Sequence, residues 1–308
     1  MDTKTSIAGV PFASYACNAS GPNDASLEEL DIIGASASAA IMMKSCTAEP
    51  REGNEEPRYA RLPHGAIQSM GLPNLGYEAY VQFAAKLKRH GKPVIASVAG
   101  LCTDDYERMV SAFQKSEADL IEVNLSCPNI KGKPQVAYDI AQTDTILGRI
   151  MKLGAKPVGV KLPPFYDLVH HKQMAALLRK HNVAFISLIN SIGNTLVIDP
   201  ETEKPVIRPK GGLGGLSGTY IKPVALANVH IFYEELQGSV PIFGVGGVTS
   251  GTDAFEFLLA GADAVQVGTA FEKEGPDCFA RIDRELKDIL KRKGYASVAD
   301  AKGKLKQW

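Results

Sequence analysis

Short apolar runs alternate along this chain with longer segments whose apolar residues recur at helical spacing. The short runs predict buried strands, because polar, glycine or proline residues bound them. Strand cores are predicted at 40–43, 94–98, 120–123, 158–160, 185–189, 242–245 and 264–267, with a first strand near 13–16. Helices are predicted at 77–90, 104–116, 139–153, 168–181, 223–236, 253–259 and 278–293, and a capping box at Ser26 to Glu29 opens an earlier one.

This order of elements, repeated about eight times, favours an α/β fold of the (β/α)₈ or TIM-barrel type. An open doubly wound sheet has the same local order, but the strand count and the lack of an early Gly-x-Gly-x-x-Gly favour the barrel. Residues 1–308 fit one such domain. The connections 44–76 and 190–218 are too long for simple links, so we expect inserted loops that build a site at the C-terminal face.

The composition limits the binding partners and the cellular compartment that we expect. The formal net charge is +0, with 34 basic and 34 acidic residues, which gives no reason to expect nucleic acid or an anionic membrane. There is no signal-peptide pattern and no apolar run long enough to span a bilayer. The five scattered cysteines lack metal-binding spacing, so we expect no metal and a cytoplasmic protein with free thiols. Packing roles are expected for Cys17, Cys46, Cys102 and Cys278, and surface positions for His170 and His171.

Polar residues follow the strand cores where the carboxyl ends of barrel strands would converge. Lys44, Asn124, Lys161 and Asn190 each stand at such a position. A lysine there can bind an anion, stabilise negative charge or form a Schiff base, although a single one could equally be a solvated surface charge. Cys127 lies in the same kind of place, within 124–129, and alone could be an inert buried thiol.

Glycines end the last two strands. Gly246-Gly247 and Gly268-Thr269 follow the strand cores at 242–245 and 264–267. Loops after the last two strands of a barrel often bind phosphate, since glycine lets backbone N–H groups approach the oxygens. Tight turns would also use glycine, but the two sites together predict a phosphate-bearing ligand beside a thiol, two lysines and three asparagines.

The motifs together resemble class 1A dihydroorotate dehydrogenases. The resemblance rests on Asn-Leu-Ser-Cys-Pro-Asn at 124–129, Met-Lys-Ser at 43–45, Ser-Met-Gly-Leu-Pro-Asn at 69–74 and Asn-Ser-Ile-Gly-Asn at 190–194, in order along the chain. It implies a cytoplasmic, homodimeric FMN barrel that oxidises (S)-dihydroorotate to orotate in pyrimidine (UMP) biosynthesis. Fumarate would be the electron acceptor and would leave as succinate.

The resemblance also implies roles. Cys127 would be the base for the C5 proton while a hydride passes from C6 to flavin N5, Lys44 would contact flavin and substrate, and Lys161 would stabilise charge on the reduced flavin. The substrate would contact Lys44, Gln68, Met70, Gly71, Leu72, Asn124, Asn129, Asn190 and Ser191. FMN would contact Ala19, Ser20, Lys44, Ser45, Asn124, Lys161, Ile189, Gly218, Gly246, Gly247, Gly268 and Thr269. Residues 130–134 would form a lid with Gly132 as hinge.

One position departs from the family, and two other functions compete. Gln68 stands where the family usually has asparagine, which affects substrate affinity more than the reaction. A barrel aldolase or isomerase would use Lys161 as a Schiff-base nucleophile and would be colourless and trapped by borohydride. A non-catalytic binding module would keep its function in a Cys127→Ala variant. The class with an iron–sulfur partner subunit is disfavoured by the 70–74 motif and the missing cysteine cluster.

Overall fold

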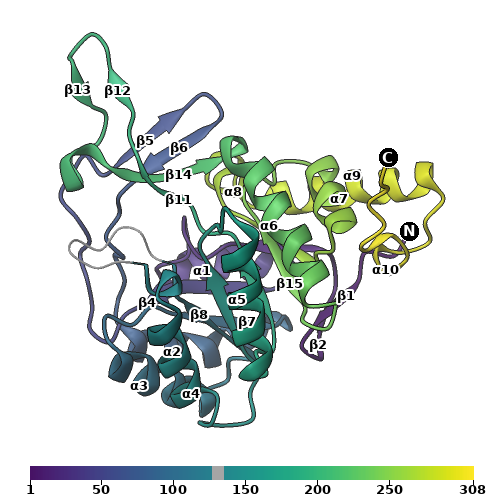
Figure 1. Cartoon of the computed structure of the whole chain (residues 1–308), viewed down its shortest axis with the longest axis horizontal. Coiled ribbons are helices and arrows are strands. Elements are labelled where there is room, and N and C mark those ends of the chain that lie inside the picture. Colours follow the sequence, from purple (N-terminus) through teal and green to yellow (C-terminus); the bar gives the residue numbers. More distant parts are fainter. Residues whose placement is uncertain (127–134) are drawn as a thin grey trace.

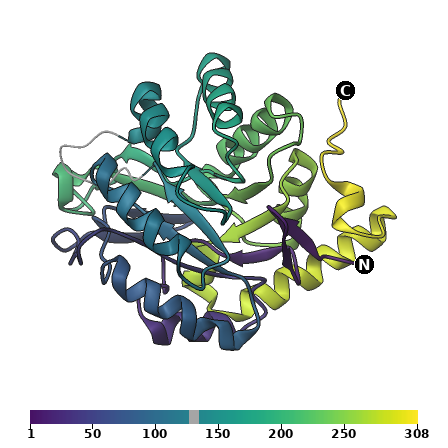
Figure 2. The same ribbon diagram turned by 90° about the horizontal axis from the view of Figure 1, so that it is seen from below.

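The computed structural model describes residues 1–126 and 135–308. Within these residues, eight parallel strands form a ring surrounded by helices (Figures 1 and 2). In chain order the strands are β3 (Ala16–Asn18), β4 (Ile41–Cys46), β7 (Val94–Val98), β8 (Leu120–Asn124), β9 (Val158–Leu162), β10 (Ile186–Leu188), β15 (Ile242–Val245) and β16 (Ala264–Val267). Neighbours along the ring follow the order β3, β16, β15, β10, β9, β8, β7, β4. The predicted (β/α)₈ barrel is confirmed.

A side chain joins the two ends of this strand order. Asn18 on β3 is fully buried, and its Nδ2 donates to the Met42 carbonyl of β4 at 2.8 Å. Its Oδ1 accepts from the Met42 N–H at 2.9 Å. The side-chain amide of Asn18 thus takes the place of a neighbouring strand for the Met42 backbone groups. The ring closes between β3 and β4 through these two bonds.

The amino-terminal end of the barrel is filled with apolar side chains. A hairpin of β1 (Thr5–Ile7) and β2 (Val10–Phe12) covers that end, and Ile7 and Phe12 are buried in the core inside the ring. The Phe12 ring lies 5.8 Å from the ring of Phe243, which lies 5.7 Å from that of Phe185. This packing excludes water from the amino-terminal end and leaves the carboxyl end for polar groups.

Helices cover the outside of the ring. They are α1 (Leu27–Ala35), α2 (Tyr77–Leu87), α3 (Thr103–Gln114), α4 (Ile140–Ile150), α5 (Leu168–Lys180), α6 (Lys222–Glu235), α7 (Gly251–Ala260), α8 (Thr269–Glu274), α9 (Asp277–Lys293) and α10 (Val298–Ala301). Short 3₁₀ turns occur at η1 (Lys88–His90), η2 (Val136–Tyr138), η3 (Pro209–Gly212) and η4 (Thr219–Ile221). The predicted capping box at Ser26 and Glu29 is confirmed at the start of α1.

The two long insertions pair with each other. They form an antiparallel sheet in the order β11 (Ile192–Thr195), β14 (Gly214–Gly218), β6 (Gly65–Gln68), β5 (Tyr59–Leu62), with a ribbon of β12 (Ile198–Asp199) and β13 (Lys204–Pro205) beyond it. Figure 1 shows this sheet beside the barrel, toward the upper left. A Cβ on Gly65 would lie 2.0 Å from the Ser217 carbonyl oxygen, so close strand approach requires glycine there.

Three expectations were wrong in detail. The first barrel strand begins at Ala16 rather than near 13, because residues 13–15 form a bend between the hairpin and the barrel. His171 is buried, with Nε2 3.2 Å from Asn228 Oδ1, because its face of α5 packs against α6. Cys102 is exposed just before α3, whereas the other three structural cysteines are buried. No helix among the described residues is long and apolar enough to cross a membrane.

Candidate active site

One pocket opens at the carboxyl ends of the barrel strands, next to the second sheet. It encloses about 1300 Å³, part of which is open to solvent. All of the predicted site residues that the structure describes line it: Ala19, Ser20, Lys44, Ser45, Gln68, Met70, Gly71, Leu72, Asn124, Lys161, Ile189, Asn190, Ser191, Gly218, Gly246, Gly247, Gly268 and Thr269. Cys127, Asn129 and the predicted lid at 130–134 lie outside the described residues.

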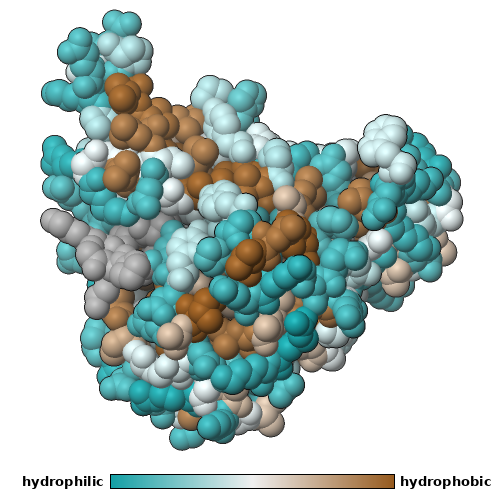
Figure 3. Space-filling view, in the orientation of Figure 1, coloured by the Kyte–Doolittle hydropathy of each residue, from teal (hydrophilic) through white to brown (hydrophobic). Residues whose placement is uncertain are grey.

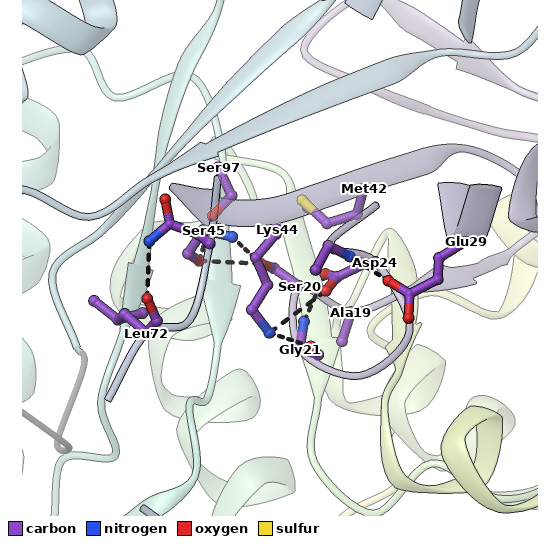
Figure 4. Close-up of polar contacts among 12 residues, drawn as sticks. Ala19, Ser20, Gly21, Asp24, Glu29, Met42, Lys44, Ser45, Leu72 and Ser97 are labelled. Carbon is purple, nitrogen blue, oxygen red and sulfur yellow. Dashed lines mark hydrogen bonds and ion pairs between the residues drawn. The ribbon is translucent and has the colours of Figure 1, made fainter. Parts of the chain in front are cut away.

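Hydroxyl groups link the strand ends along one wall. Ser20 Oγ accepts from the Ser45 N–H at 2.7 Å and lies 3.0 Å from Ser45 Oγ. Ser45 Oγ in turn lies 2.8 Å from Ser97 Oγ and accepts from Asn124 Nδ2 at 3.2 Å. Figure 4 shows Ser20, Ser45 and Ser97 in this row. Because these groups are mostly buried and mutually bonded, the wall is ordered before any ligand binds.

Two asparagines from separate strands are fixed through one serine. Asn124 Oδ1 accepts from Ser126 Oγ at 2.9 Å, and Asn190 Nδ2 donates to the same Oγ at 2.9 Å. Asn190 Oδ1 accepts from the Ser191 N–H at 2.8 Å. These bonds set the orientation of both amides at the pocket, where amide groups can read the edge of a flat polar ring.

Gln68 points into the pocket and already has partners. Its Oε1 accepts from the Met70 N–H at 3.0 Å, and its Nε2 lies 3.5 Å from Ser191 Oγ. A Cβ on Gly215 would lie 2.4 Å from Ser191 Oγ and 3.2 Å from Gln68 Nε2. Glycine at 215 therefore makes the room in which the longer Gln68 side chain reaches Ser191.

Lys44 extends from β4 toward the loop that follows β3. Figure 4 shows its ammonium group reaching the Gly21 carbonyl and the Asp24 carboxylate. The Lys44 Nζ to Asp24 Oδ1 distance is 3.5 Å, and the Asp24 side chain has no solvent exposure. Burial raises the pKa of Asp24 to about 6, with the Lys44 charge and the Gly21 N–H opposing that rise.

Lys161 brings a buried positive charge to the pocket. It is 3% exposed, and among the described residues its ammonium group makes no hydrogen bond or ion pair. The nearby carboxylate of Glu122 is engaged by Ser187 Oγ at 2.6 Å and Gln266 Nε2 at 3.1 Å. A mostly buried lysine side chain with no bonded counter-charge among the described residues makes this end of the pocket suit an anionic ligand.

Glycines open the backbone at the far side of the pocket. Gly246, Gly247 and Gly218 have φ values of +127°, +75° and +83°, which glycine adopts far more readily than other residues. A Cβ on Gly247 would lie 2.7 Å from Lys222 Cβ and 3.0 Å from the Gly218 carbonyl oxygen. Together with Gly268 and Thr269, these positions form a cradle that suits a phosphate group.

Several residues near the pocket were not singled out from the sequence. Glu122 and Gln266 lie inside the ring, and the only signal was a polar residue within each apolar strand. Glu272 of α8 accepts from Arg61 at 2.6 Å and from Tyr59 at 3.2 Å, which fastens the hairpin of β5 and β6 to the barrel. Nothing in the sequence singled out Asp24, because aspartate is common in loops such as the one it occupies.

Comparison with known proteins decides the family. The profile of the family described as dihydroorotate dehydrogenase matches residues 2–290. The chain belongs to the dihydroorotate dehydrogenase family. It is 47% identical over 306 residues to dihydroorotate dehydrogenase A (fumarate) of Lactococcus lactis subsp. cremoris, covering 98% of each chain. A Streptococcus uberis protein that carries the same name provisionally is 49% identical over 308 residues, covering 99% of this chain and 98% of that one.

The fold comparison agrees. A solved dihydroorotate dehydrogenase from Eimeria tenella, in complex with ferulenol, superposes with a TM-score of 0.83 at 23% identity, covering 98% of this chain and 88% of that one. At this identity the likeness concerns the fold. Within the family the chain belongs to class 1A. Dihydroorotate dehydrogenases are flavin-dependent oxidoreductases, so this chain is a flavin-dependent oxidoreductase by family.

Proposed function

We propose that this protein oxidises (S)-dihydroorotate to orotate in pyrimidine biosynthesis, with fumarate as electron acceptor. Membership of class 1A supports the reaction. The structural observation that carries the proposal is the convergence of Lys44, Lys161 and the glycine cradle in one pocket at the carboxyl end of the barrel. We propose that residues 1–308 form a single barrel domain, which contains all of these residues.

The bound flavin would be FMN, which would accept the electron pair taken from the substrate. The cradle at Gly246, Gly247 and Gly268 would hold its single phosphate, where a side chain at Gly247 would crowd the backbone. Ala19, Ser20, Ser45, Asn124, Ile189, Gly218 and Thr269 would contact the rest of the cofactor. The ammonium group of Lys161 would stand where negative charge develops on reduction, and a positive charge at that place lowers the barrier.

The remaining residues would bind and orient dihydroorotate. Asn124, Asn190 and Ser191 carry amide and hydroxyl groups that suit the pyrimidine ring, and Asn129 would add another. Backbone N–H groups of 70–72 would hold the carboxylate, and Lys44 would supply positive charge beside it. Cys127 would take the proton from C5 as the hydride leaves C6, which forms the C5–C6 double bond of orotate.

Fumarate would use the same pocket after orotate leaves. Both substrates are small carboxylates, and the pocket carries the positive charges of Lys44 and Lys161. The electron pair and two protons would pass to fumarate to give succinate. One site that serves two substrates in turn predicts ping-pong kinetics.

Turnover of the purified protein with both substrates tests the proposal. We expect equal amounts of orotate and succinate, and a Cys127→Ala variant that loses about 10²-fold or more of this turnover. A protein that makes no orotate under these conditions would refute the proposal. A colourless protein that borohydride traps through Lys161 with a carbonyl substrate would point to the aldolase instead.

We propose further that the enzyme is a cytosolic homodimer, as the class assignment implies. Large apolar side chains are exposed near α5 and on the second insertion, namely Tyr166, Leu168, Val169, Leu196 and Ile198. Figure 3 shows hydrophobic colour gathering on this face between the β12–β13 ribbon and the helices. A dimer interface would cover such residues. Light scattering during gel filtration should give twice the mass of 33.0 kDa, and a monomer would contradict the proposal.

A further inference from the structure

A carboxylate that no catalytic step uses lies against the most exposed cation of the pocket. Asp24 lies in the loop after β3, has no solvent exposure, and faces Lys44 with Oδ1 at 3.5 Å from Nζ. That Oδ1 has no hydrogen-bond partner among the described residues, while Oδ2 accepts from the Gly21 N–H at 2.7 Å. The Gly21 carbonyl also accepts from Lys44, so one residue of this loop binds both the carboxylate of Asp24 and the ammonium group of Lys44 (Figure 4).

We propose that Asp24 is a positioning residue, which holds the Lys44 ammonium group at the Gly21 edge of the pocket so that it meets the substrate and the flavin together. The inference rests on the proposed function, in which Lys44 contacts both. A lysine side chain has four rotatable bonds, so an ammonium group without a fixed partner would sample several positions. An ion pair inside a mostly buried pocket limits it to one.

The charges around Asp24 allow the ion pair to depend on pH. Lys44 faces it from β4, Glu29 faces it from α1, and Tyr80 approaches it from α2. Glu29 is occupied by the N–H groups of Ala25 and Ser26, and the Tyr80 hydroxyl donates to the Ala25 carbonyl. Lys44 is therefore the cation of this group. With the pKa of Asp24 near 6, the ion pair would be present at pH 8 and largely lost at pH 5.

The Asp24→Asn variant separates positioning from general damage. Asparagine has the same shape and can keep the Gly21 bond, but it removes the negative charge beside Lys44. We expect kcat at pH 8 to fall about tenfold, while orotate binding to the oxidised enzyme stays equal or tightens, because an anion then meets an uncompensated ammonium group. The ratio of wild-type to variant kcat should approach one at pH 5. Glu29→Gln is the matched control, since it removes a neighbouring negative charge without touching Lys44.

A second measurement needs no turnover. In protein labelled with ¹³C at aspartate carboxyl groups, the resonance that disappears in Asp24→Asn belongs to Asp24. It should titrate near pH 6 in the holoenzyme, and its midpoint should rise in Lys44→Met, because the ammonium group no longer favours the charged carboxylate.

The outcomes separate the two levels of the argument. Equal kcat values at pH 8, or an Asp24 midpoint that is the same in Lys44→Met as in wild type, would overturn the positioning role even in an active dehydrogenase. If Asp24→Asn lowers kcat and orotate binding together, the titration midpoint of Asp24 in Lys44→Met decides between the two explanations. A raised midpoint supports the positioning role, and an unchanged midpoint indicates general damage. If dihydroorotate does not reduce the flavin of the wild-type protein, the proposed function is refuted. The shift of the Asp24 titration midpoint in Lys44→Met would still report the ion pair in that case.

Discussion

Replacing Asp24 by asparagine should make the protein more stable at alkaline pH. Asp24 is fully buried, and its pKa is raised from the ordinary value of 3.8 to about 6, first by burial and against the opposing charge of Lys44. The folded state therefore holds the proton more tightly than the unfolded chain does. The free energy of unfolding falls as pH rises through this window, because the unfolded chain ionises at 3.8 and the folded protein only near 6.

The magnitude follows from the same difference. At about 1.4 kcal/mol per pKa unit, a charged Asp24 lowers the free energy of unfolding by about 3 kcal/mol once the pH is well above 6. At pH 5 the loss is smaller, about 2 kcal/mol, since the folded carboxyl is still mostly protonated. Asparagine carries no charge at either pH. The stability gained by Asp24→Asn should thus be larger at pH 8 than at pH 5, by about 1 kcal/mol.

Urea unfolding of the wild type and the variant at both pH values measures this difference. The comparison needs equal slopes with urea, which show that the same surface is exposed in each case. A gain that is equal at pH 5 and pH 8, or a variant that is less stable at pH 8, would refute the reasoning. A confirmed gain would mean that the chain keeps a destabilising charge at its pocket, as expected where function requires it.

Other substitutions test the rest of the pocket. Lys161→Met should lower turnover about 10²-fold or more and make the flavin midpoint potential more negative, and an unchanged potential in a spectroelectrochemical titration would contradict its role. Gln68→Asn should keep activity and lower KM, because the shorter side chain leaves the Met70 N–H to the substrate carboxylate, and complete loss of activity would argue against this. Gly247→Ala should weaken FMN binding about tenfold or more, measured by fluorescence titration of the apoprotein, since its Cβ would lie 2.7 Å from Lys222 Cβ. Gly294→Ala is the control, because its φ of +78° is similar and its Cβ would meet open space; equal FMN affinities would contradict the cradle.

The barrel could be predicted because its signals are local. The runs 94–98, 242–245 and 264–267 coincide with β7, β15 and β16, since a strand buried on both faces is apolar throughout. Once the barrel is inferred, its geometry brings Lys44, Asn124, Lys161 and Asn190 to one mouth, and the structure places all four at one pocket. The roles assigned to them come from the family and stay predictions.

The second sheet and the Asp24 ion pair could not be predicted in the same way. Strands β6 and β14 pair Gln68 with Gly215, so their partners are far apart in sequence and their short, glycine-rich segments show no alternation. Asp24 meets Lys44 only because the loop after β3 folds over β4. Glu122 could have been noticed, because a charged residue within an apolar strand must find buried partners.

An anaerobic titration of the purified protein with dihydroorotate, followed through flavin absorbance, tests most directly whether this pocket oxidises that substrate. The account predicts a bound flavin whose visible absorbance bleaches on addition of about one equivalent of dihydroorotate and returns with fumarate. A flavin that stays oxidised would contradict the substrate assignment and make Gln68 the first residue to examine. A protein that neither contains nor binds FMN would contradict the account as a whole.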